Sequence, residues 1–271
     1  MKVAILAGGR GIRLYGAAAD QPKALFDIGD RPIIWHTMQI YQAAGFTDFV
    51  LLLGYKAEKI VDYFVHDTLS LDADIQLISR SLTDPVEATV VNPARSPWSV
   101  TLCRTGRDSP TGERVRRAKP YLDDQERFML TYGDGLADIP LDELLEFHIA
   151  HGKLATVTVV RAHSQFGHVS LGRDGRVERI EEKPLLPEWI NGGFFVCERG
   201  IFDYLEPDDI FERDCLPRLA AAGELVAYRH EGFWACMDTY KDSLRLNELW
   251  ESGQPPWPGS FNTDERGPDS E

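Results

Sequence analysis

A glycine-rich loop directly after a short apolar run constrains this chain more than any other feature. The run Val3–Ala7 predicts a short buried strand, and the loop GGRGIRL follows it at residues 8–14. Glycines lack Cβ atoms, so the backbone can approach a ligand closely and direct N–H groups at it. Arg13 and Lys23 are candidate cations for phosphate charge. The loop has neither the Gly-Lys-Ser/Thr ending of a P-loop nor the GxGxxG spacing, and it predicts a phosphate site of another kind.

The order of the segments that follow predicts an α/β fold. The predicted strands are Val3–Ala7, Asp48–Leu53, Val100–Cys103, Phe128–Tyr132 and Leu154–Val160, and the predicted helices are Ile33–Ala44, Ala57–Val65, Gly112–Lys119 and Leu141–His151. This alternation is typical of a mostly parallel sheet with helices on both faces. Ligands bind such sheets at the carboxyl ends of the strands. The glycine-rich loop and the segment Gly133-Asp134-Gly135 both lie at such ends.

The second half of the chain predicts a small antiparallel portion and two further helices. The predicted antiparallel strands are His168–Leu171, Val177–Glu182 and Ile190–Val196, with a hairpin turn at Gly172–Gly175. Asp208–Ala222 is predicted to be helical and interrupted near Pro217, Leu225–His230 to be a strand, and Tyr240–Trp250 to be the last helix. The segment from Gly253 onward is rich in Pro, Gly, Ser and acidic residues and is predicted to be loose.

Composition limits the partners. The net charge of −14 argues against a nucleic-acid partner, because the phosphate backbone requires cations. The four cysteines lie far apart, which is typical of reduced thiols in a cytosolic protein. The first apolar run is too short for a signal peptide, and no segment approaches the ~18 apolar residues of a membrane span. We therefore expect a cytoplasmic protein of one large α/β domain, or of one domain with an appended lobe, that binds no membrane.

Two aspartates are candidate ligands for Mg²⁺. Asp134 follows a predicted buried strand, and Asp238 precedes a predicted helix. Magnesium commonly uses one or two carboxylates together with substrate phosphates. The alternatives are a turn-forming role for Asp134 and a helix N-cap role for Asp238, and both roles are common. The presence of a phosphate loop in the same chain favours the metal interpretation.

Two further groups of residues have a structural and a functional interpretation. A cationic cluster consists of Arg104, Arg107, Arg114, Arg116, Arg117 and Lys119. Most of it is expected to be a solvated helix face, with one or two members that steer a nucleotide. Lys183 could hold a second phosphate and Asn191 could bind hydroxyl groups, but without further context a surface lysine and a turn-forming asparagine are the preferred interpretations.

The motifs LAGGRGIRL, PKAL, IGDRPIIWH, GYK, TYGDG, EKP, INGGFFV and GFWACMDT occur in an order that resembles the sugar-1-phosphate nucleotidylyltransferase superfamily. Within it, IIWHTMQIY and HGKLATVTVV are similar to the glucose-1-phosphate cytidylyltransferase branch. The resemblance covers roughly residues 1–257. It implies a Rossmann-like, mixed and mostly parallel sheet flanked by helices, of the nucleotide-diphospho-sugar transferase type, with a small antiparallel sugar-binding portion. It also implies one domain over 1–257, with a nucleotide-binding part at about 1–135, a sugar-phosphate-binding part at about 136–257, and a flexible tail at 258–271.

The resemblance also implies roles for individual residues. The residues implied around the nucleotide are Leu6, Ala7, Gly8, Gly9, Gly11, Ile12, Arg13, Lys23, Thr111, Gly112, Arg114 and Asp134. Those implied around the sugar phosphate are Gly167, Glu182, Lys183, Asn191 and Gly192. Asp134 and Asp238 would hold Mg²⁺, and the residues implied in catalysis are Arg13, Lys23, Asp134, Lys183 and Asp238. A homo-oligomer, either a trimer or a hexamer, is also implied.

The sequence predicts nucleotidyl transfer from a nucleoside triphosphate to a sugar 1-phosphate, with release of pyrophosphate. CTP and glucose 1-phosphate are favoured. The chain departs from the branch pattern at Ile12, Gln21, Ala24, Pro110 and Glu113. UTP, dTTP or GTP, or another sugar or cyclitol phosphate, therefore remain alternatives. A non-catalytic sensor of nucleotide sugars is a second alternative, although it would have no reason to keep two phosphate cations and two metal carboxylates together.

Overall fold

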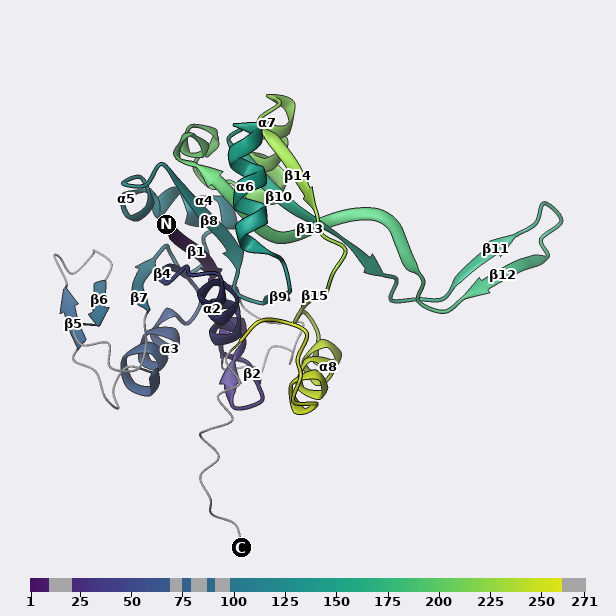
Figure 1. Ribbon diagram of the computed structural model, residues 1–271, viewed down its shortest axis with the longest axis horizontal. Coiled ribbons are helices and arrows are strands. Elements are labelled where there is room, and N and C mark those ends of the chain that lie inside the picture. The colour runs from purple at the N-terminus through teal and green to yellow at the C-terminus, as the bar shows by residue number, and fades with distance from the viewer. Residues whose placement is uncertain (10–20, 69–74, 79–86, 91–97, 260–271) are drawn as a thin grey trace, which may run out of the picture.

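A nine-stranded mixed sheet runs through the computed structural model, which describes residues 1–9, 21–68, 75–78, 87–90 and 98–259 (Figure 1). In spatial order the strands are β14 (Leu225–Arg229), β10 (Ala155–His163), β13 (Leu185–Glu198), β8 (Arg127–Tyr132), β1 (Lys2–Ala7), β4 (Asp48–Leu53), β7 (Ser99–Arg104), β6 (Glu87–Val90) and β5 (Ile75–Ile78). Strand β1 pairs in parallel with both β4 and β8, and β4 pairs in parallel with β7. Strand β13 is antiparallel to both of its neighbours. The predicted mixed, mostly parallel sheet is confirmed.

Helices cover both faces of this sheet. Successive side chains of a strand point to opposite faces, so each strand contributes to two cores. Val3 and Ile5 of β1 are buried in one core and Ala4 and Leu6 in the other. The first core includes residues of α2 (Ile33–Ala43), α3 (Ala57–Asp62), α6 (Leu141–His151) and α8 (Tyr240–Glu251). The second includes residues of α4 (Thr111–Arg117), α5 (Lys119–Leu122), the turns η4 (Arg199–Tyr204) and η5 (Phe211–Cys215), and α7 (Leu216–Ala221). Burial on both faces explains why apolar residues follow one another without alternation in β1, β4 and the Phe128–Leu130 part of β8.

A long antiparallel arm leaves the sheet through β10 and β13 (Figure 1). Its outer part is the hairpin of β11 (His168–Leu171) and β12 (Val177–Glu181), which projects away from the rest of the molecule. The predicted turn is present, since the N–H of Gly175 donates to the carbonyl of Gly172 at 3.0 Å. The predicted strand Ile190–Val196 is confirmed as part of the longer β13. We call residues 164–184 the arm.

The remaining elements are short and connect the sheet to its rims. They are η2 (Lys23–Leu25), β2 (Asp27–Ile28), β3 (Arg31–Pro32), η3 (Tyr63–Thr68), β9 (Gly135–Ala137) and β15 (Trp234–Cys236). The helix predicted over Asp208–Ala222 begins only at Phe211 as the π-helical turn η5. It becomes α-helical at Leu216, where Pro217 occupies a first-turn position that needs no N–H donor.

The chain is ordered beyond the point that composition suggests. Trp257 is buried with its ring 6.0 Å from that of His36 and 5.8 Å from that of Phe233. The prediction that the chain is loose from Gly253 onward is therefore wrong at this residue, because an indole ring finds an apolar site on the body. The tail predicted for 258–271 lies almost wholly outside the described residues. In the described part of the chain, no helix is both long enough and apolar enough to cross a bilayer.

Candidate functional site

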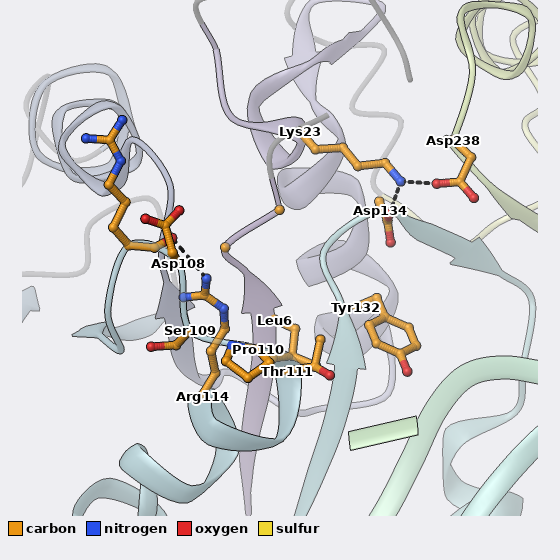
Figure 2. Close-up of a pocket in the computed structure, with 13 residues that line it drawn as sticks. Leu6, Lys23, Asp108, Ser109, Pro110, Thr111, Arg114, Tyr132, Asp134 and Asp238 are labelled. Atoms are coloured by element: carbon orange, nitrogen blue, oxygen red, sulfur yellow. Dashed lines mark hydrogen bonds and ion pairs between the residues drawn. The ribbon is translucent and has the colours of Figure 1, made fainter. Parts of the chain in front are cut away.

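A pocket of about 700 Å³ opens at the carboxyl ends of β1 and β8 (Figure 2). Leu6, Gly8 and Gly9 line it from the end of β1, and Tyr132 and Asp134 from the end of β8. The segment from Arg107 to Thr111 lines the opposite side, together with Arg114. The chain proceeds from β1 to β4 on one side and returns to β8 on the other, so the pocket lies at a switch point of the sheet, where ligands of α/β proteins bind.

Lys23 joins two carboxylates at one edge of this pocket. Its Nζ contacts both Asp134 and Asp238, as the dashed lines in Figure 2 show. Asp134 lies between β8 and β9, and Asp238 follows β15, which pairs with β9. Burial alone would lower the pKa of Lys23, but attraction and hydrogen bonds from both carboxylates outweigh it and raise the pKa. Lys23 is therefore an ammonium ion at neutral pH.

The same pair of carboxylates fits a divalent metal ion. A single cationic group contacts both of them, which means that Asp134 and Asp238 are close enough to share one cation. Two carboxylate donors that act together with substrate phosphates are typical of Mg²⁺ sites. The N-cap interpretation of Asp238 is wrong, since Thr239 caps α8 in a reciprocal capping box with Asp242. Asp134 does lie in a turn, and its carboxylate faces Lys23.

Arg114 lines the pocket on the side away from Lys23, and its guanidinium group donates hydrogen bonds to other parts of the protein. Nη1 donates to the carbonyl of Gly106 at 2.7 Å, to Thr105 Oγ1 at 2.9 Å and to the carbonyl of Leu53 at 3.0 Å. The group fills the space that a Cβ would take at either Gly8 or Gly54. Arg114 therefore connects the ends of β1, β4 and β7. Its position also explains why residue 8 is a glycine, with no need for a bound ligand.

Two other members of the cationic cluster, Arg116 and Arg117, have a structural role on helix α4. Arg116 and Arg117 pair with buried Glu113 at 2.7 and 2.5 Å. The hydrogen bond from Arg116 is the largest influence that lowers the pKa of Glu113 to about 2. Glu113 does not line the described pocket, nor does Gly112, where a Cβ would lie 2.8 Å from Asp209.

The predicted sugar residues fall into two groups. Gly167, Glu182 and Lys183 lie together in the arm, where Lys183 Nζ is 3.3 Å from Glu182, and they do not line the described pocket. Asn191 approaches the pocket, because its Nδ2 lies 3.3 Å from the hydroxyl of Tyr132. At Gly192 a Cβ would lie 3.0 Å from the carbonyl of Thr158, which indicates a packing role.

The other residues that the sequence analysis named lie outside the pocket, on its lining or outside the described residues. Gly11, Ile12 and Arg13 lie outside the described residues. Ala7 is buried in the core on the α2 face. The amide of Gln21 donates to the carbonyl of Leu25, Ala24 is buried, and Pro110 lines the pocket.

Sequence reasoning missed Tyr132 as a pocket residue. It also missed Glu212, whose carboxylate accepts hydrogen bonds from Tyr132 and, at 2.7 Å, from Thr111. The position of Tyr132 two residues before Asp134, at a strand end, is a signal that could have identified it. Glu212 lies in a polar stretch with no motif of its own.

Comparison with known proteins adds to this geometry. The profile of the nucleotidyl transferase family matches residues 2–251. A probable glucose-1-phosphate cytidylyltransferase of Bacillus subtilis is 43% identical over 95% of this chain and 99% of its own length. A glucose-1-phosphate cytidylyltransferase of Salmonella typhimurium is 40% identical over 95% and 98%. Among solved structures, HddC from Yersinia pseudotuberculosis has a TM-score of 0.65 at 23% identity, over 92% of this chain and 99% of that chain, and supports the fold alone.

Proposed function

Because this chain belongs to the nucleotidyl transferase family, we propose that it transfers a cytidylyl group from CTP to glucose 1-phosphate, giving CDP-glucose and pyrophosphate. The shared contact of Asp134 and Asp238 with Lys23, at the edge of a switch-point pocket, is the observation that carries the reaction. The choice of CTP and glucose 1-phosphate rests on the two relatives at 43% and 40% identity, whose names state glucose-1-phosphate cytidylyltransferase.

The chemistry needs no general base. The second pKa of a phosphate monoester is about 6, so the sugar phosphate is already an anionic nucleophile at neutral pH. Its oxygen forms a bond to the α-phosphorus of the triphosphate, and the bond from that phosphorus to the bridging oxygen breaks as pyrophosphate leaves with the electron pair. Catalysis then consists of positioning and charge neutralisation. Lys23 is a cation at neutral pH beside the pocket, and it contributes to charge neutralisation.

We assign Asp134 and Asp238 to Mg²⁺, which would neutralise phosphate charge in this site. Lys23 would then bind phosphate oxygens, because the carboxylates that it contacts would have a stronger cation to hold. Arg13 is assigned to the triphosphate and Lys183 to the sugar phosphate on the resemblance alone. Variants of each, assayed for the Michaelis constants of both substrates, test those two assignments.

The assembly and location of the protein are proposed on separate grounds. The arm and its base expose Phe166, Val169, Leu171, Val177 and Ile180, with Phe166 76% exposed. A two-stranded hairpin is marginally stable by itself, and apolar side chains on it favour contact with a second copy. We therefore propose a homo-oligomer, a trimer or a hexamer, that forms through the arm. Free cysteines at positions 103, 197, 215 and 236 support a cytoplasmic location.

Pyrophosphate release over a panel of triphosphates and sugar phosphates tests the proposal. We expect the highest kcat/KM for CTP with glucose 1-phosphate, in a reaction that requires Mg²⁺. Release with UTP or dTTP but not with CTP would keep the class of reaction and reject the nucleotide. Release with no pair would favour a sensor of nucleotide sugars instead.

A further inference from the structure

A carboxylate behind the pocket wall joins two hydroxyl groups that line the pocket. Glu212 comes from η5, and its Oε2 accepts a hydrogen bond from Thr111 Oγ1 at 2.7 Å. Its Oε1 accepts a hydrogen bond from the hydroxyl of Tyr132. Thr111, at the start of α4, and Tyr132, at the end of β8, both line the pocket (Figure 2). Glu212 itself does not line it, so its effect on a ligand would be transmitted through these two side chains.

The protons of this network can be assigned from the chemistry of its members. An ionised carboxylate only accepts hydrogen bonds, so both hydroxyl groups donate their single proton to Glu212. The Tyr132 hydroxyl therefore has only lone pairs to offer to any other group. Burial raises the pKa of Tyr132, and the charge of Glu212 raises it further. The tyrosine thus remains a neutral phenol, and its oxygen remains an acceptor.

Asn191 places a donor beside that acceptor. Its Oδ1 accepts a hydrogen bond from the N–H of Gly193 at 2.8 Å, which determines the orientation of the amide group. Nδ2 consequently faces Tyr132 and lies 3.3 Å from the phenol oxygen. Each Nδ2 carries two hydrogens, so one N–H serves Tyr132 and the second is a donor for a ligand. An acceptor on Tyr132, which lines the pocket, then lies next to a donor on its neighbour Asn191.

We propose that Glu212 is a positioning residue that sets the hydrogen-bond polarity of the pocket where Tyr132 meets Asn191, and that the sugar phosphate binds there. It makes Tyr132 an acceptor beside the amide donor of Asn191, and the pair selects a sugar phosphate with a hydroxyl at that point. A hydroxyl satisfies both partners, since it donates to the phenol oxygen and accepts from the amide. A ring carbon without a hydroxyl leaves the second amide hydrogen of Asn191 and the remaining lone pair of the Tyr132 oxygen without a ligand partner, and sites built to hydrogen-bond a substrate hydroxyl discriminate strongly against such a substrate. The inference rests on the proposed function.

The test compares substrates as well as variants. Pyrophosphate release is measured with CTP and with glucose 1-phosphate or its analogues that each lack one hydroxyl. We expect the wild type to disfavour at least one analogue by about tenfold or more in kcat/KM. Glu212→Ala should raise the KM for glucose 1-phosphate by about tenfold to a hundredfold, the range for a hydrogen bond to a charged group. It should reduce the discrimination against that analogue to about threefold, with a smaller change in the KM for CTP.

Two further variants keep the test independent of folding. Glu212→Gln retains the shape of the side chain but has a single acceptor oxygen, and we expect it to lose part of the discrimination. Tyr132→Phe removes the acceptor itself and should lose the same discrimination, with no further loss when it is combined with Glu212→Gln. Glu206→Gln is the matched control, because the Glu206 side chain is 73% exposed in the same region of the chain. It should behave as the wild type does.

Unchanged discrimination in Glu212→Gln and Glu212→Ala would overturn the inference, as would an equal loss of kcat for every analogue. These results differ from failure of the proposed function, which would show in the wild type. If the wild type prefers another sugar phosphate, the same comparison uses analogues of that sugar. If it releases no pyrophosphate, the affinities for glucose 1-phosphate and its analogues, measured by calorimetry, decide the inference in the same way.

Discussion

Gly54→Ala and Arg114→Ala should be far less destabilising together than the sum of their separate effects. The three atoms nearest to a Cβ on Gly54 all belong to the Arg114 guanidinium group and lie far inside van der Waals contact. The backbone of Gly54 is outside the left-handed region, so alanine carries no conformational strain there. The cost of Gly54→Ala is therefore the cost of moving the guanidinium away from its hydrogen-bond partners.

The structure sets the size of that cost. Without Arg114, the carbonyl of Leu53 still accepts from the N–H of Thr105 at 3.0 Å and from its hydroxyl at 2.8 Å. The carbonyl of Gly106 loses a charged donor at 2.7 Å, and such a bond contributes about 1.5–3 kcal/mol. We expect each single variant to lose about 2–3 kcal/mol of unfolding free energy. The double variant should lose about the same amount as Arg114→Ala alone.

Urea denaturation of the four proteins at neutral pH measures this cycle. Gly135→Ala is the matched control, because among described atoms its Cβ would meet only Phe194, at an ordinary 3.7 Å, and it should be neutral or slightly stabilising. If the losses in the double variant add to within about 0.5 kcal/mol, the two residues do not share the space that we describe. Arg114 would then have a role other than connecting these strand ends.

Three other predictions concern the site, the pH dependence and the assembly. Asp134→Asn should lower turnover by orders of magnitude in the pyrophosphate assay, and near-normal activity would reject its assignment to Mg²⁺. Burial lowers the pKa of His36 to about 4, against the opposing hydrogen bond that its ring donates to Ile28. Between about pH 6.5 and pH 4 the unfolded chain thus binds a proton that the folded chain does not, and stability falls as the pH falls through this window. From pH 7 to pH 4.5 the share of this loss that comes from His36 should be about 2–3 kcal/mol, measured in urea titrations as the difference between the losses of the wild type and of His36→Gln; equal losses in both proteins would show that His36 is not its source. Ile180→Asp should reduce self-association in sedimentation experiments while the thermal midpoint at low concentration stays unchanged, and an unaltered oligomer would show that this face of the arm is not the contact.

Local sequence signals predicted most of the elements, because their cause is local. The runs at Val3–Ala7 and Asp48–Leu53 are apolar at every buried position, and strands covered on both faces require that pattern. Gly172 and Gly175 predicted the turn of the arm for a similarly local reason. Trp257 shows the limit, since its segment has the composition of a loose tail and is held only by rings from distant parts of the chain.

In the candidate site, too, the sequence identified single residues, whereas their arrangement depends on the fold. The motifs pointed to Lys23, Asp134 and Asp238 one at a time, and the two aspartates lie beside a strand end and a helix start that the pattern reveals. Their meeting on one ammonium group depends on the pairing of β9 with β15, which joins segments far apart in the chain. No local pattern encodes that pairing.

The sequence alone determined the class of fold and the kind of reaction, because periodicity and ordered motifs are properties of short segments. Only the tertiary structure showed that Arg114 connects the strand ends and that Glu212 lies behind Tyr132 and Thr111. An arginine or a glutamate is compatible with many roles. Its role is decided by which acceptors and donors the fold places around it, and here those partners come from other strands and turns.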